Sequence, residues 1–417
     1  MLVDSGLVAE ECWKAAIPVQ LRLADSEVSS LEQPPVLYFL VPRYSYLHRL
    51  VPQALQLLQH LLPPGELVPW FEHGHLPLKW GVPAGVMYDL VAGPGGELPW
   101  QLTLHFRGFP DRQLPAYGGE AALRGAFFNS LKEATHICRG SAQRVMEMAA
   151  GAQEDLWRQV LAGSLQQYQR IVGPLQLAPA VVRGRGPAAV PLRLYIRRDS
   201  GGYLSSYEDI VCTSRPVAAQ APDGSSVTLR QALLPLIEEC LAETLPEDPA
   251  GGPTAAAGAA AVDTAGGQAA EGGAEGGGLA GASADAESPR PAEAEASASS
   301  LDGGATGSRD AAELSGTGAA SAATEAAEAG EPAAGELAAG APAESLAAAA
   351  AAAAAAGTAA QAAAATALER AAAARGVLVC GTAPPLDTPL AWLHAQMHAG
   401  DHFLYVVLHL GRAAATT

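Results

Sequence analysis

The sequence predicts an α+β protein in which two copies of one strand–helix module flank a small helical domain, with a long insertion in the second copy. Three observations predict it. Stretches in which apolar and polar residues alternate, as in a half-buried strand, occur at 17–23 and again at 190–196. Helical periodicity fills 117–172. The stretch from about 246 to 373 has no aromatic residue and is dominated by alanine, glycine, glutamate, serine and proline.

The first module has the order strand, strand, helix, strand, short helix, strand. Its strands are expected at 17–23, 35–42, 76–80 and 100–106. The run 35–42 is apolar through its middle, which favours a central place in the sheet. Leucine and valine at helical spacing predict an amphipathic helix over 46–62, and a short helix is expected around 86–91. This order is typical of the β-grasp fold, the fold of ubiquitin.

Helices at 121–138, 142–148 and 153–171 follow, with four aromatic residues expected inside: Phe127, Phe128, Trp157 and Tyr168. The first pattern then returns. Strands are expected at 190–196, 209–213, 376–380 and 402–410, and a helix over 227–245 with Thr228 or Ser226 as its N-cap. The tetrapeptide 77–80, Pro-Leu-Lys-Trp, recurs at 389–392 as Pro-Leu-Ala-Trp, which indicates an internal repeat.

These patterns divide the chain into an N-terminal segment and three domains. The segment is 1–13, the first ubiquitin-like domain 14–110, the helix-rich domain 111–187, and the second ubiquitin-like domain 188–245 joined to 374–413. The insertion, 246–373, cannot bury enough apolar surface to offset an ordering entropy of roughly 1–2 kcal/mol per residue, so we expect disorder there. Its alanine-rich end, 346–375, is expected to be helical only transiently.

Charge and cysteine usage exclude several classes of function. The formal net charge is −18, and 17 acidic residues against two arginines place −15 of it between 247 and 344. The remainder has no basic stripe, so nucleic-acid binding is not expected. Five cysteines without a C-x-x-C pair indicate reduced thiols in the cytoplasm. A signal peptide is not expected, because residues 1–13 carry Asp4, Glu10 and Glu11 and lack a cationic start. A membrane span is not expected, because the uncharged run 346–368 is mostly alanine.

A single lysine marks the candidate site. Lys132 is one of three lysines and follows the buried helical stripe formed by Phe127, Phe128 and Leu131, so its ammonium is expected to reach water. Lys79 is expected to cover Trp80 with its stem, and Lys14 has no comparable context. From the residues alone, a solvated helix lysine is the favoured interpretation.

Several segments together resemble the autophagy protein 5 family. The matching stretches are 40–47, 70–80, 99–106, 131–134, 155–157, 191–196 and 388–392 with 403–404, which cover nearly everything outside the insertion. The family resemblance implies two ubiquitin-like domains around a helical domain, no cofactor and no active site. It also implies that Lys132, in Leu-Lys-Glu-Ala, accepts an isopeptide bond to the ubiquitin-like autophagy protein 12.

The resemblance implies further partners. The conjugate would bind the N-terminal helix of autophagy protein 16, meet E2-like enzymes transiently, and act as an E3-like factor for lipidation of autophagy protein 8 with phosphatidylethanolamine. This places the chain in the cytoplasm and, peripherally, on the preautophagosomal membrane. Arg124 stands where the family often has a carboxylate, which would weaken a contact to the attached protein.

Three alternatives stay open. The chain could be an unmodified adaptor with two ubiquitin-like domains, or a hydrolase using Cys138 and His136, although side chains two apart point to different faces of a helix. Metal binding is disfavoured, because His73 and His75 lack further ligands and Gly400 interrupts the spacing of His394, His398 and His402. A groove between the domains is expected for the partner helix. Met146, Met148 or leucines of 46–62 are candidates for its lining, but core packing is the favoured interpretation for each.

Overall fold

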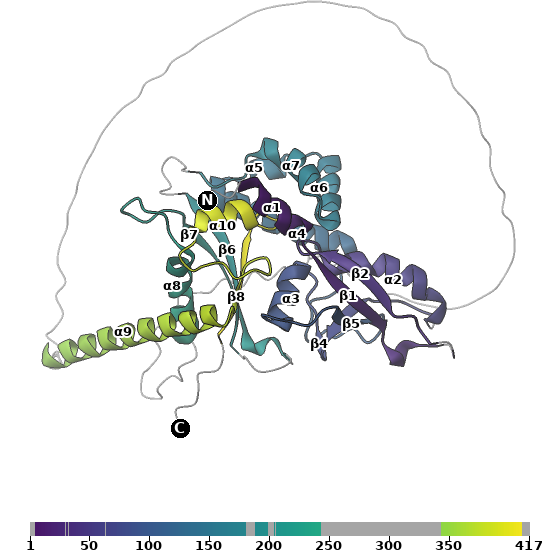
Figure 1. Ribbon diagram of the computed structural model, residues 1–417, viewed down its shortest axis with the longest axis horizontal. Coiled ribbons are helices and arrows are strands. Elements are labelled where there is room, and N and C mark those ends of the chain that lie inside the picture. Colours follow the sequence, from purple (N-terminus) through teal and green to yellow (C-terminus); the bar gives the residue numbers. More distant parts are fainter. Residues whose placement is uncertain are drawn as a thin grey trace, which may run out of the picture. The chain divides into compact units, whose positions relative to one another are not determined.

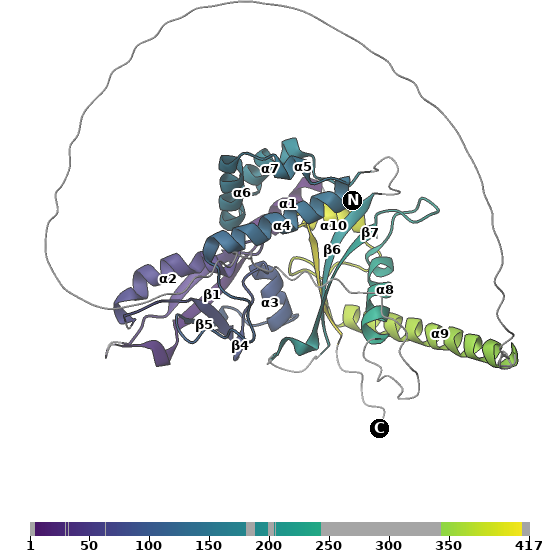
Figure 2. The same ribbon diagram turned by 180° about the vertical axis from the view of Figure 1, so that it is seen from behind.

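The computed structural model describes residues 5–242, with gaps at 30, 32, 63, 181–187, 199–203 and 205, and residues 343–410. These residues belong to one compact unit, and Figures 1 and 2 show its two sheets with the helices packed on them. The expectation of disorder for 246–342 lies outside the described residues.

The first sheet places its parallel strands side by side at the centre. It contains β1 (Ala16–Leu23), β2 (Leu37–Pro42), β3 (Trp70–His73), β4 (Leu76–Pro77) and β5 (Trp100–His105), in the order β2-β1-β5-β3-β4. β1 and β5 are parallel, with Val19 opposite Trp100, and the other pairs are antiparallel. The alternation of β1 is confirmed, because Ile17, Val19 and Leu21 are buried.

Two expectations for this sheet were wrong. The run 35–42 is not central: β2 is an edge strand, and its Tyr38 and Leu40 are 67% and 70% exposed. Both faces of this strand are apolar, so composition could not tell an edge strand from a central one. The strand expected over 76–80 is instead a hairpin of β3 and β4, whose two-residue turn, Gly74 and His75, has positive φ at both positions.

The helices of the first module differ in how they are buried. α2 (Leu50–Leu58) lies between the 3₁₀ turns η2 (Leu47–Arg49) and η3 (Gln59–Leu61), which together replace the single helix predicted over 46–62. α2 buries one face and leaves Leu57 exposed. α3 (Ala84–Ala92) is buried on all sides from 84 to 91. It packs against β2 of the first domain and against β9 (Leu404–His409) of the second domain. A short turn, η1 (Asp25–Glu27), follows β1.

The helical region consists of α4 (Gly119–Arg139), α5 (Gln143–Met146), α6 (Ala150–Ala162), α7 (Leu165–Val172) and the turn η4 (Gly173–Leu175). The four aromatic residues predicted to lie inside are buried. The helix expected over 153–171 is broken at Gly163, which has a φ of 71°. A Cβ there would lie 2.7 Å from the Cβ of Pro42, so glycine permits both the turn and the close approach of β2.

The second sheet repeats the topology of the first. It contains β6 (Ala189–Arg197), β7 (Ile210–Ala218), β8 (Val377–Leu378) and β9 (Leu404–His409), in the order β7-β6-β9-β8. β6 and β9 are parallel, as β1 and β5 are. Helix α10 (Leu390–Met397) precedes β9 as α3 precedes β5, and η5 (Tyr207–Asp209) leads into β7. The predicted fold, two β-grasp domains flanking a helical region, is confirmed.

The recurring tetrapeptide is weaker evidence for the internal repeat than the shared strand order is. Leu78 and Leu390 are both buried, but Trp80 is 8% exposed and contacts the Phe71 ring, whereas Trp392 is 38% exposed on α10. Leu390 already begins its helix, while Leu78 lies well before α3. The motif therefore marks corresponding regions of the two modules without marking equivalent side chains.

The insertion ends earlier than we expected. Residues 343–373, predicted to be disordered, form the helix α9, whose later part packs on α8 (Leu229–Ala242). Figure 1 shows α9 beside α8. Ala364, Ala367 and Leu368 are buried there, which supplies the stabilisation that an isolated alanine helix lacks. Of the two residues predicted as the N-cap of α8, Thr228 caps the helix, because its Oγ1 accepts from the Gln231 N–H at 3.3 Å.

Two adjacent alanines test the packing of α9. We expect Ala364→Leu to lower the free energy of unfolding by about 1–3 kcal/mol, because Ala364 is fully buried and its site is filled. Ala363→Leu makes the same chemical change at an exposed position one residue earlier and should alter stability by less than about 0.5 kcal/mol. Urea denaturation measures both, and equal effects would contradict the packing.

Candidate conjugation site and partner groove

Lys132 lies in the third turn from the C-terminal end of α4. The predicted stripe beneath it is confirmed, because Phe127, Phe128 and Leu131 are buried. The lysine side chain itself is partly exposed, and within the described residues no hydrogen bond or ion pair holds its ammonium. The helix ends at Gly140, which is left-handed with a φ of 77° and donates its N–H to the His136 carbonyl at 2.7 Å. Lys132 is therefore an accessible amine on a well-anchored helix.

The residues on either side of Lys132 bind the second domain. Arg193 of β6 donates to the Glu133 carboxylate at 3.2 Å and to the Ser130 hydroxyl at 3.4 Å, and the Ser214 hydroxyl of β7 also donates to Glu133 at 3.2 Å. Arg193 lies over the Phe403 ring, 3.9 Å from its centroid, and bonds the Tyr405 hydroxyl at 3.2 Å. Glu133 is thus engaged with the second sheet, not with Lys132.

The other two lysines have partners. Lys14 forms an ion pair with Glu10 at 2.7 Å, and the hydrogen bond that its ammonium donates to the Glu10 carboxylate raises the pKa of this lysine. The Lys79 ammonium lies 4.3 Å from the centroid of the Tyr207 ring, which belongs to the second domain. The expectation that the stem of Lys79 covers Trp80 stays a prediction, and the structure adds Tyr207 as the partner of its ammonium. The three lysines lie in the described part of the chain, and Lys132 alone has neither an ion pair nor a ring contact there.

Arg124 has a partner within its own domain. Its guanidinium forms an ion pair with Glu154 of α6. The sequence predicts that Arg124 weakens a contact to an attached protein. Because the pair already neutralises this charge, the guanidinium serves the packing of α4 on α6.

An apolar groove of about 910 Å³ lies between α1 (Ser5–Lys14) and α10. Its walls include Leu7, which is 53% exposed, and Trp392, which is 38% exposed. Its remaining apolar lining is contributed by Val8, Cys12, Ala15, Cys380, Pro384, Pro385, Pro389, Leu393 and Met397. Glu11 and Asp387 add acidic charge. The candidates named from sequence are elsewhere: Met146 is 66% exposed outside the groove, and Met148 packs on the core.

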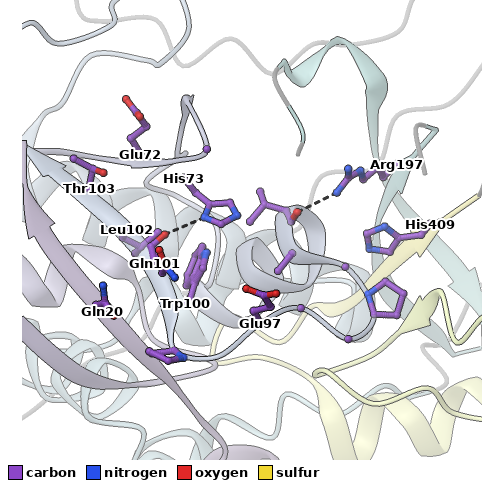
Figure 3. A pocket seen from close by; sticks show the side chains of 18 of the residues that line it. Gln20, Glu72, His73, Glu97, Trp100, Gln101, Leu102, Thr103, Arg197 and His409 are labelled. Carbon is purple, nitrogen blue, oxygen red and sulfur yellow. Dashed lines mark hydrogen bonds between the residues drawn. The ribbon is translucent and has the colours of Figure 1, made fainter. Parts of the chain in front are cut away.

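A second, polar cavity of about 810 Å³ lies between the first sheet and the second domain (Figure 3). Trp100 and His73 come from the first sheet, and Arg197 and His409 face them from β6 and β9. Arg197 donates to the Val91 carbonyl at 3.0 Å, and His409 bonds the Asp89 carbonyl at 2.8 Å. The Trp100 Nε1 is buried without a partner in the described residues. The cavity carries both signs of charge, and these contacts join the two modules.

The residues proposed for a hydrolase do not form one. Cys138 is 1% exposed, and burial raises the pKa of its thiol to about 12, so it holds its proton at neutral pH. His136 is exposed on another face of α4. His75 is exposed, and His73 donates from Nδ1 to the Gln101 carbonyl at 3.0 Å. Within the described residues, no group of three or more potential ligands has the geometry to hold a metal ion.

Three histidines form a buried cluster beside the groove. The rings of His398 and His402 are stacked with centroids 4.1 Å apart, and His394 lies 5.4 Å from His398. Burial lowers the pKa of His394 to about 3 and also lowers the pKa values of His398 and His402. His394 bonds the His402 carbonyl at 2.9 Å. The cluster is therefore a neutral, structural part of the second domain.

Comparison with known proteins follows the same three-part division. The family model for the autophagy protein ATG5 UblA domain matches residues 12–106, the alpha-helical bundle region matches 120–177, and the UblB domain matches 343–408. The chain belongs to the autophagy protein 5 family. The predicted resemblance is thereby confirmed, and the UblB match begins where α9 begins.

Relatives and a solved structure agree with this membership. The chain is 36% identical to autophagy protein 5 of Oryza sativa subsp. indica over 284 residues, which cover 60% of this chain and 74% of the relative. It is 35% identical to that of Arabidopsis thaliana over 262 residues, 55% of this chain and 77% of the relative. The crystal structure of Kluyveromyces marxianus Atg5 matches at a TM-score of 0.51 with 14% identity, covering 96% and 99% of the two chains, which shows a shared fold.

Family membership gives the chain a role in autophagy through partners of that process. In the described part of the chain, no helix has the length and hydropathy needed to cross a membrane.

The histidine cluster predicts a loss of stability in acid. An unfolded histidine has a pKa of about 6.5, so below that pH the unfolded chain binds protons that the folded cluster does not. The contribution of the cluster to the free energy of unfolding should be complete at pH 7. It should fall toward pH 5 by about 1.4 kcal/mol per pH unit for each histidine. Chemical denaturation at several pH values measures the slope. His394→Asn should reduce this slope by about one proton. His75→Gln changes an exposed site and should leave the slope unchanged.

Proposed function

We propose that this chain is a non-catalytic scaffold that is conjugated through Lys132 to autophagy protein 12. Three observations support it: Lys132 is partly exposed, it has no competing ion pair in the described residues, and the adjacent Glu133 is tied to Arg193. An acceptor amine needs access and a firm base, because the enzyme that brings the thioester supplies the remaining chemistry.

The reaction is an acyl transfer to nitrogen. The Nζ lone pair attacks the thioester carbonyl of the incoming ubiquitin-like protein, the C–S bond breaks, and the enzyme thiolate leaves. Free lysine has a pKa of about 10.4, so the amine must lose a proton to the E2-like enzyme during the step. Because that enzyme supplies the base, no side chain next to Lys132 in this chain has to act as one.

The groove between α1 and α10 supports the second part of the proposal, docking of the N-terminal helix of autophagy protein 16. Leu7 and Trp392 offer exposed apolar surface of the kind that an amphipathic helix buries. Glu11 and Asp387 beside it favour a helix that carries basic residues next to its apolar anchors.

The assembled conjugate acts, in this proposal, as an E3-like factor that promotes transfer of autophagy protein 8 to phosphatidylethanolamine. The chain is cytoplasmic and becomes peripheral on the preautophagosomal membrane through its partners. The alternative is an adaptor with two ubiquitin-like domains that is never covalently modified.

Lys132→Arg separates these two functions. We expect it to abolish the conjugate, because arginine keeps the charge but its guanidinium is protonated at all relevant pH values and does not acylate. Lys14→Arg and Lys79→Arg are matched controls and should leave the conjugate in full amount. Reconstitution with the conjugating enzymes, followed by a denaturing gel and mass spectrometry of the branched peptide, measures this. A conjugate that persists in Lys132→Arg would refute the assignment.

Two leucines of similar exposure test the groove. Leu7 in the groove is 53% exposed and Leu57 on α2 is 49% exposed. We expect Leu7→Asp to weaken binding of a peptide of the partner helix at least tenfold, about 1.4 kcal/mol, because it places a charge on the apolar wall. Leu57→Asp should leave the affinity unchanged. Isothermal titration calorimetry measures both, and equal affinities would place the helix elsewhere.

A further inference from the structure

Two cysteines far apart in the sequence meet at the floor of the groove. Cys12 belongs to α1, and Cys380 follows β8 in the second domain. The Cys380 thiol donates to the Cys12 carbonyl oxygen at 3.8 Å, and both residues line the groove. Both are reduced in the structure. This contact and the shared lining of the groove make the two cysteines neighbours in the fold.

The surroundings of the two thiols are unequal. The hydrogen bond from Cys12 lowers the pKa of Cys380, and so do the Arg43 guanidinium and the Tyr44 hydroxyl; burial and Asp89 oppose this shift. The hydrogen bond to Cys380 and burial raise the pKa of Cys12. Cys380 is partly exposed and Cys12 is 7% exposed. Cys380 therefore has the thiolate character and access of a reacting thiol, with a protonated thiol beside it.

The backbone at Cys380 adds a second, independent observation. Cys380 has a φ of 50°, a left-handed conformation that residues other than glycine and asparagine seldom adopt. The next residue, Gly381, has a φ of 74°, and a Cβ there would lie 2.5 Å from the Arg43 Cζ. The turn is thus held in a strained shape that keeps the thiol against Cys12 and the guanidinium.

We propose that Cys12 and Cys380 form a reversible disulfide, with Cys380 as the thiol that a peroxide oxidises and Cys12 as the thiol that resolves it. The Cys380 thiolate attacks hydrogen peroxide, the O–O bond breaks, and Cys380 becomes a sulfenic acid as hydroxide leaves. The Cys12 thiol then attacks that sulfur, an S–S bond forms, and the sulfenic oxygen leaves as water. Two electrons pass from the sulfur atoms to the peroxide in total.

The bond would join α1, one wall of the groove, to the turn after β8, which also lines it. Oxidation removes the freedom of α1 to leave the second domain, and a reductant restores it. The other three cysteines lie on α4, α8 and β7 and do not line the groove.

Peptide mapping of the full chain under non-reducing conditions tests the proposal. After treatment with hydrogen peroxide at pH 7, we expect a cross-linked peptide joining Cys12 to Cys380 that dithiothreitol reverses. Cys212 is the matched control, because it is more exposed than Cys380 yet should be modified at least tenfold more slowly. Faster modification of Cys212, or a disulfide between another pair, would overturn the proposal.

Variants separate the two roles. Cys12→Ser should leave Cys380 as a sulfenic acid that a dimedone-type probe traps, whereas Cys380→Ser should leave Cys12 unlabelled. Trapping at Cys12 in Cys380→Ser would reverse the roles and contradict the assignment. The pH dependence of iodoacetamide alkylation in the unaltered chain needs no variant. Cys380 should react at a lower pH than a free thiol does, and a midpoint at or above the free-thiol value would count against it.

Discussion

A buried ion pair at the junction of the two β-grasp modules supports the rest of the arrangement. Arg43, just after β2, pairs with Asp89 of α3 and also donates to the Gly85 carbonyl at 3.2 Å. From the other module, Arg197 donates to the Leu90 and Val91 carbonyls at the end of α3. His409 binds the Asp89 carbonyl, which also accepts the Gly93 N–H. Removing one member of such a pair costs about 3–5 kcal/mol, because the other charge stays buried. α3 thereby belongs to both modules at once.

Contacts with the second domain also hold α4 in place. Arg193 reaches from β6 to Ser130 and Glu133, while the Tyr405 hydroxyl donates to the buried Asp401 at 2.7 Å. From the helical region, the Tyr168 hydroxyl donates to the Gly400 carbonyl at 3.0 Å. Lys132 therefore projects from a helix fixed at several points on the second domain. In the proposed function, this rigidity replaces any catalytic group, since an acceptor needs only position and access.

Part of the candidate site could be predicted from sequence and part could not. The stripe of Phe127, Phe128 and Leu131 follows a helical period, so the outward direction of Lys132 was predictable. The partners of Lys79 and Glu133 were not, because Tyr207, Arg193 and Ser214 come from a module that only the fold brings near. A groove was expected, but its lining could not be predicted for the same reason: its walls, α1 and α10, come from opposite ends of the chain.

The sequence by itself determined the two β-grasp modules, the helical region between them and the lysine on its first helix, because periodicity and capping are local properties. Only the tertiary structure decided that β2 lies at an edge and that α9 is an ordered part of the second domain. It also decided that Cys12 meets Cys380. An alanine-rich stretch is stable as a helix only when a partner surface covers it. The composition of an apolar strand does not show whether it pairs with one neighbouring strand or with two. Both depend on contacts between residues distant in the chain.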